Sequence, residues 1–155
     1  MKNDVEVSFY HFTCVPLLKA VPSLIAKIYD SQRNSLVLCK DEESLDELNK
    51  YLWSFSTKIF LPHGSVQEKH SEKQPILLST EIVENNKPRV LLSFIDIDND
   101  YLSKFESVMF VFFGNKKDKN VEDMYNRFNN LKNKDNLKVK FWLQDVSTGK
   151  WQQAS

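Results

Sequence analysis

The sequence predicts an α/β domain in which a mostly parallel sheet carries helices on both faces. Short apolar runs rich in Leu, Val and Phe recur along the 155 residues, and such runs are typical of strands buried on both faces of a sheet. Between several runs lie stretches whose apolar residues are three and four apart, the spacing of an amphipathic helix. No repeat, low-complexity segment or linker divides the sequence, so we expect a single domain over residues 1–155.

The sequence begins with a strand and a helix. Residues 5–12 alternate partly between polar and apolar and are rich in Val and aromatic residues, which favours a strand. We expect the helix to run from about residue 19 to 31, with Pro22 in its first turn, where a missing N–H donor is tolerated. Its buried stripe would consist of Val21, Leu24, Ile25 and Ile28.

Residues 35–64 form the unit around which the other elements are arranged. The apolar run at 35–39 predicts a buried strand, and Asp41 is suited to cap the helix that follows. A second apolar run at 58–61 predicts another strand, which the Pro-His-Gly sequence at 62–64 would end. The helix between the two strands would bury a stripe of leucines, Leu45, Leu48 and Leu52.

The rest of the sequence continues the alternation. Further strands are expected at residues 76–80, 89–95, 108–113 and 137–143, and a last helix at 121–132. Polar segments predict an exposed loop at 65–74 and turns at 84–87, 96–100, 114–120 and 147–149. The last strand alternates polar and apolar residues, so it could run antiparallel with one wet face. Together these elements predict a three-layer, Rossmann-like arrangement.

Composition limits the classes of function. Lys plus Arg equals Asp plus Glu, at 21 each, and this balance argues against broad binding to a phosphate backbone. The two cysteines, Cys14 and Cys39, sit in or beside apolar runs, which favours two buried thiols in a reducing compartment. The sequence shows neither the order of a signal peptide nor an apolar run long enough to span a bilayer. We therefore expect a cytoplasmic protein.

Motifs that carry catalytic chemistry are missing from the sequence. It contains no Gly-rich phosphate-binding fingerprint and no Gly-x-Ser-x-Gly elbow, and its histidines show no metal spacing with a cysteine. The acidic turn at 96–100 resembles a calcium loop but lacks the following Gly and the distant Glu, so a solvated turn is favoured. His63 could act as a general base, yet a structural or interface role suits it better. We predict no catalytic residue, no metal and no cofactor.

Several motifs in the same order resemble the chi subunit of bacterial DNA polymerase III holoenzyme, over nearly the whole length. The densest match is Leu52-Trp53-Ser54-Phe55 followed by Phe60-Leu61-Pro62-His63-Gly64. Further matches are Gln74-Pro75-Ile76-Leu77-Leu78, Phe141-Trp142-Leu143-Gln144 and Gly149-Lys150-Trp151. The last helix departs from the family, which usually opens it with Ala-Arg and ends it in Gly. Here Met124-Tyr125-Asn126-Arg127-Phe128 and Lys134-Asp135-Asn136 stand instead.

The resemblance implies an accessory, non-catalytic adaptor with two partner-binding surfaces. One would hold the psi subunit, which links chi to the clamp loader. The other would hold the C-terminal tail of single-stranded DNA-binding protein (SSB), an acidic peptide ending in Phe. Candidate residues on the psi side are Trp53, Phe60, Leu61, Pro62 and His63. Candidate residues for the SSB tail are Arg127, Phe128, Lys132 and Trp142, cations and aromatic rings that suit such a tail.

Each candidate also has a plainer interpretation. Trp53, Phe60 and Phe128 could fill the domain's own core, and the lysines could form a solvated face. A nucleotide- or metal-dependent α/β enzyme remains an alternative and would bind its ligand at the carboxyl ends of the strands. Direct binding of single-stranded nucleic acid is another, with bases stacked on Trp142, Phe128 and Tyr125.

Overall fold

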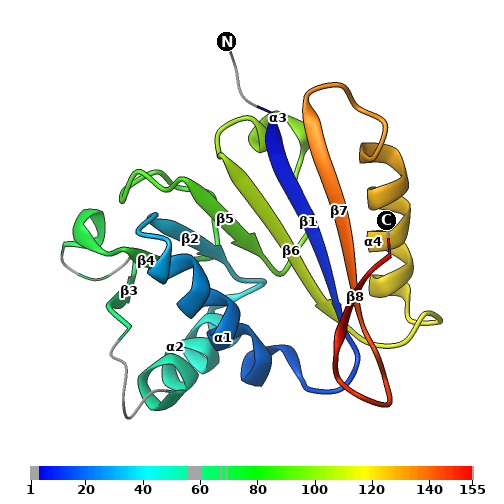
Figure 1. Cartoon of the computed structure of the whole chain (residues 1–155). Coiled ribbons are helices and arrows are strands. Elements are labelled where there is room, and N and C mark those ends of the chain that lie inside the picture. The colour runs from blue at the N-terminus through cyan, green and yellow to red at the C-terminus, as the bar shows by residue number, and fades with distance from the viewer. Residues whose placement is uncertain (1–3, 56–60, 67, 69, 155) are drawn as a thin grey trace.

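One eight-stranded sheet runs through the computed structural model, which describes residues 4–55, 61–66, 68 and 70–154 (Figure 1). Its strand order is β3-β4-β2-β5-β6-β1-β7-β8, and every neighbouring pair is parallel except β7 with β8. The strands are β1 (Val5–Phe12), β2 (Ser35–Leu38), β3 (His63–Ser65), β4 (Ile76–Ser79), β5 (Val90–Ser93), β6 (Ser107–Phe113), β7 (Leu137–Gln144) and β8 (Trp151–Gln153). The predicted α/β class and mostly parallel sheet are confirmed, and the closer likeness to Rossmann folds stays a prediction.

Helices contribute to hydrophobic clusters on both faces of this sheet. The helices are α1 (Leu17–Asp30), α2 (Glu42–Phe55), α3 (Asn99–Leu102) and α4 (Lys119–Leu131), with a 3₁₀ helix η1 (Ser71–Lys73). Along β2, Leu36 and Leu38 join the cluster that contains α4, whereas Val37 joins the cluster that contains α1 and α2. Successive side chains of a strand point to opposite faces, so the two clusters lie on opposite sides of the sheet. None of the helices within the described residues is long and apolar enough to cross a membrane.

Helix α1 begins earlier than the sequence predicted. It starts at Leu17, and Pro22 therefore lies inside the helix and is buried there. Because proline has no N–H, the carbonyl of Leu18 loses its ordinary intrahelical partner at this point. Val21, Ile25 and Ile28 are buried as predicted, and Leu24 is partly buried.

The central unit follows its prediction up to the end of α2. Asp41 Oδ1 accepts a hydrogen bond from the Ser44 N–H at 2.8 Å, which caps the helix and lowers the pKa of the Asp41 carboxyl. The predicted leucine stripe is buried. The strand expected at 58–61 falls mostly on residues 56–60, outside the described residues. The expected stop at 62–64 is wrong in part, because β3 begins at His63 and pairs with β4.

Three further expectations need correction. The loop at 65–74 contains η1, and the turn at 96–100 gives way to the short helix α3. Strand β7 runs parallel to β1, not antiparallel, because α4 carries the chain from β6 across to the far side of β1. The C-terminal hairpin partner β8 was not predicted, and it makes the antiparallel pair instead.

Candidate functional site

Trp53 and His63 meet where the sheet ends at β3. The Trp53 side chain, near the end of α2, is 58% exposed. Its ring is tilted against the His63 ring, with 4.7 Å between the ring centroids. His63 itself is buried, and its Nδ1–H donates to the Leu61 carbonyl at 2.7 Å. Trp53 therefore exposes a large aromatic surface, and the buried His63 ring packs against it.

The other psi-side candidates are placed differently. Leu61 is 2% exposed and belongs to the core cluster of α1 and α2, so it has almost no surface to offer a partner. Leu61 and His63 were both predicted to contribute to the psi-side surface. Both side chains are buried near the β3 edge of the sheet, so neither is exposed to a partner as that prediction requires. Pro62 is half-buried. Phe60 lies outside the described residues.

Arg127, on α4, is held by the loop that follows β5. Its Nε–H donates to Asp96 Oδ1 at 2.8 Å, and its Nη2 donates to the Ile97 carbonyl at 2.7 Å. The Arg127 side chain is only 14% exposed. Lys132 is exposed, and its Nζ lies 5.8 Å from the centroid of the Phe128 ring. Arg127 thus has structural partners of its own, whereas Lys132 faces solvent.

Phe128 is a core residue, as the plainer interpretation held. It packs edge-on against Phe9 and Phe141, with centroids 5.7 and 5.1 Å apart. Trp142 follows Phe141 on β7 and therefore points to the opposite face of the sheet. The predicted slot between Phe128 and Trp142 is therefore wrong, because the sheet itself separates the two rings.

The crevice at the carboxyl ends of β2, β4 and β5 is acidic. It has a volume of about 540 Å³, and its lining includes the carboxylates of Glu81, Asp96 and Asp98. A nucleotide brings phosphates to this end of a parallel sheet, and like charges in its lining would repel them. Among the described residues, no group of three or more His, Cys, Asp or Glu could hold a metal ion.

Sequence reasoning missed a notch between α1 and β8. It has a volume of about 290 Å³, and four aromatic side chains line it, those of Tyr10, Phe12, Trp142 and Trp151. The signal is the alternation of Lys138, Lys140 and Trp142, which predicts a strand with one wet face. It marks a sheet face that α1 covers only in part. Cys14, predicted to be buried, is exposed beside this region.

Comparison with known proteins relates this chain to one family. The sequence model of the family described as "DNA polymerase III chi subunit, HolC" matches residues 5–137. A protein of Rickettsia prowazekii (strain Madrid E), named "Probable DNA polymerase III subunit chi", is 33% identical over 113 residues, which cover 68% of this chain and 68% of that protein. The family match reaches only the first residue of β7, so the rest of β7 and all of β8 lie beyond it.

Proposed function

Because the chain belongs to the DNA polymerase III chi subunit family, we propose that it acts as a non-catalytic adaptor in the clamp-loader complex of the holoenzyme. Its proposed partners are the psi subunit, or another clamp-loader protein in its place, and the acidic C-terminal tail of SSB. It would work in the cytoplasm without a cofactor, and it would neither hydrolyse nucleotides nor extend primers. Its role in replication would be to tie SSB-coated single strands to the clamp loader.

The exposed Trp53 is the observation that best supports a protein-binding role. Aromatic anchors that stand out from a rigid surface are enriched at the centres of protein interfaces. Trp53 is 58% exposed and is packed on the buried His63 ring, so a partner could cover it without the fold having to change. The same edge carries Pro62, and we propose that Phe60 adds a second anchor beside it.

Removal of the Trp53 ring tests the psi-side surface. We expect Trp53→Ala to weaken binding of the clamp-loader partner by about 2 kcal/mol, roughly 30-fold, and to leave the melting temperature nearly unchanged. Isothermal titration with the purified partner measures the first effect and thermal unfolding the second. Tyr101→Ala, at an aromatic residue of similar character that is 38% exposed on α3, is the matched control. Equal affinity for Trp53→Ala and Tyr101→Ala would exclude this edge as the binding site.

Phe60→Ala distinguishes an interface anchor from a core residue. If Phe60 is an anchor, partner binding falls and the free energy of unfolding stays the same. A loss of about 3–5 kcal/mol of folding stability would instead place Phe60 in the core.

The second partner is tested with a synthetic acidic peptide that ends in Phe. We expect chemical-shift changes on titration with it, and we expect added salt to weaken binding only moderately, because screening acts on the charged part alone. Deletion of the terminal Phe should cost more affinity than neutralisation of any one acid. If the peptide causes no chemical-shift change at any concentration, the SSB tail is not a partner of this protein. Of the candidates named from sequence for this partner, Arg127 and Lys132 lie on or at the end of α4, whereas Trp142 lies on the opposite face of the sheet, so one peptide site would contain the first two or the third.

A further inference from the structure

One face of β1 and β7 is left partly open beside α1. In β7, Val139 and Phe141 pack toward α4, so Lys138, Lys140 and Trp142 point to the opposite face. On that face the neighbouring residues of β1 are Glu6, Ser8 and Tyr10. In Figure 1, α1 and α2 lie over the side of the sheet that holds β2 and β4, and no helix covers the upper parts of β1 and β7. Parallel sheets are ordinarily covered on both faces, so this opening suits a partner.

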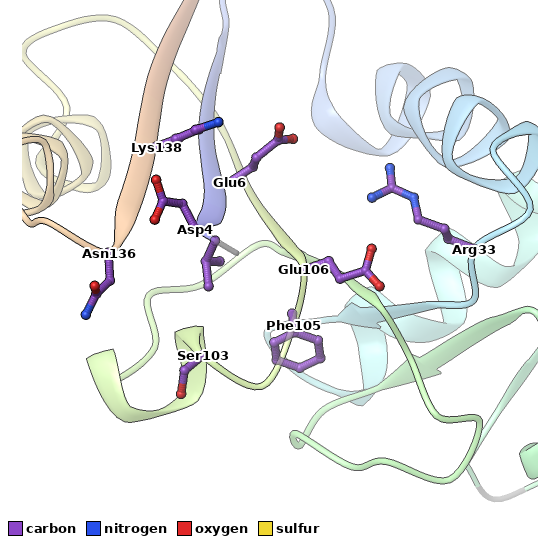
Figure 2. Close-up of a pocket in the computed structure, with 9 residues that line it drawn as sticks. Asp4, Glu6, Arg33, Ser103, Phe105, Glu106, Asn136 and Lys138 are labelled. Carbon is purple, nitrogen blue, oxygen red and sulfur yellow. The ribbon is translucent and has the colours of Figure 1, made fainter. Parts of the chain in front are cut away.

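The amino half of the open face carries carboxylates. Figure 2 shows the pocket there, which has a volume of about 860 Å³ and includes Asp4 and Glu6 in its lining. Lys138 stands beside Glu6 in the register of β7 with β1. Nevertheless, in the part of the chain that the structure describes, no ion pair involves Asp4, Glu6 or Lys138. Both acids are exposed, so they can pair with cations of a partner.

The carboxyl half of the same face carries cations and aromatic rings. Lys140 lies two residues beyond Lys138, about 7 Å along β7. Lys27 of α1 lines the aromatic notch, whose described lining includes Trp142 and Trp151 but no carboxylate. Among the described residues neither Lys27 nor Lys140 belongs to an ion pair, and both are exposed. The open face is therefore polarised, with free acids at one end and free cations at the other.

A face polarised in this way is complementary to a second copy of itself. In a two-fold dimer the same patch of both copies forms the contact, and an axis that crosses β1 and β7 lays the strands of the copies antiparallel. An axis between the levels of Glu6 and Lys140 sets each Glu6 against Lys140 of the other copy. The same axis brings Asp4 of each copy toward Lys27 of the other. Each pair then occurs twice, and the acidic half of one copy covers the cationic half of its partner.

The size of the face determines how strong such a contact can be. Strands β1 and β7 are each eight residues long, which corresponds to roughly 27 Å, and together they are about 10 Å wide. Even with the flanks of α1 and β8, the contact is smaller than the about 800 Å² per partner of a stable complex. Two copies joined by this face therefore associate weakly, and their charges set the orientation.

We propose that the open face of β1 and β7 joins two copies of this chain in a weak, symmetric dimer, with Glu6 of each copy paired to Lys140 of the other. The dissociation constant is on the order of 100 µM. This inference goes beyond the proposed function and does not depend on it, because it needs no other protein.

Sedimentation velocity of the full-length protein, from about 20 to 500 µM at low salt, tests the dimer. We expect the mass of the wild type to rise with concentration and added salt to weaken the association. Glu6→Lys and Lys140→Glu should each weaken it on the order of 10-fold or more, because two-fold symmetry sets like charges together at two contacts. An equimolar mixture of these two variants should associate again, because the mixed dimer restores both pairs. This recovery would also show that both variants are folded.

Two charge reversals elsewhere on the surface are the matched controls. Glu47→Lys on α2 and Lys73→Glu on η1 lie at exposed positions, and both should associate as the wild type does, alone and mixed. A wild type that stays monomeric up to about 500 µM overturns the inference. A wild type that associates, but whose association neither Glu6→Lys nor Lys140→Glu weakens, forms its dimer through another surface, and the inference fails as well. It also fails if the mixture of these two variants regains no association. The adaptor function stands in all three cases.

Discussion

Phe128 shows how one side chain can be assigned to the wrong surface. It is 7% exposed and is surrounded by other rings of the α4 cluster. We expect Phe128→Ala to lower the free energy of unfolding by about 3–5 kcal/mol, because it leaves a cavity in a packed core. Asn129→Ala, at the exposed neighbouring position, should change it by no more than about 0.5 kcal/mol. Urea denaturation measures both. If Phe128→Ala instead lost little stability and no longer bound the SSB tail, Phe128 would belong to a binding slot on the surface.

The two cysteines differ in environment. Burial, with help from the nearby Asp41 and Glu42 charges, raises the pKa of the Cys39 thiol to about 12, so Cys39 is almost entirely protonated at pH 8. Cys14 is exposed, and its S–H donates to the Asp145 carbonyl at 3.2 Å. We expect one thiol per native chain to react with Ellman's reagent, and two in denaturant. In Cys14→Ser the fast reaction should disappear, and rapid labelling of that variant would show that Cys39 is accessible.

At the scale of elements, the bond from Arg127 joins α4 to the loop after β5. Its removal takes the Arg127 donor from the Ile97 carbonyl and leaves Asp96 Oδ1 with the Ile97 N–H alone. Because Asp96 is 56% exposed, water replaces part of the interaction, and we expect Arg127→Ala to cost only about 1–2 kcal/mol of stability. Arg127→Glu should cost more, since it sets two carboxylates against each other. If both variants unfold at the wild-type denaturant concentration, the bond contributes nothing in solution. Peptide affinity measured on the folded variants then tells whether Arg127 also serves the SSB tail.

His11 connects β1, the turn after β6 and α4. Its Nε2–H donates to the Gly114 carbonyl at 2.6 Å, and its Nδ1 faces the Tyr125 hydroxyl at 3.1 Å. Burial lowers the pKa of His11 below its ordinary value of 6.5, against the opposing effect of the Gly114 bond. Just below pH 6.5, His11 therefore takes up a proton in the unfolded chain but stays neutral in the folded chain until the pH reaches its lower folded-state pKa.

Stability should accordingly fall as the pH drops from about 6.5 through the lower folded-state pKa of His11. Denaturation at pH 7.5 and pH 5.5 measures this loss. His11→Gln should show a smaller loss over the same interval, while His70→Gln, at an exposed histidine, should behave like the wild type. An equal loss in wild type and His11→Gln would mean that other groups cause it.

At the scale of the molecule, the sequence predicted class and element type well, because buried strands and amphipathic helices leave periodic patterns. The prediction from sequence failed where the same residue pattern can arise from two different structures. The alternation in β7 suggested an antiparallel strand, but it arises because α4 covers one face of β7 and α1 covers little of the other. It likewise could not tell on which face of the sheet Phe128 and Trp142 would lie, because strand order and the side of each crossover depend on distant parts of the chain.

The position of β1 also governs when the protein can fold during its synthesis. This strand leaves the ribosome before the other seven strands of the sheet, yet both of its neighbours lie more than 90 residues further along, with Val7 beside Val108 in β6 and beside Val139 in β7. Until those residues emerge, the backbone groups of β1 have no partner and its Phe9 has no core to enter. A nascent chain therefore carries an unpaired, aggregation-prone strand until β6 and β7 have been made. Only when β7 pairs with β1 is that strand hydrogen-bonded on both of its edges.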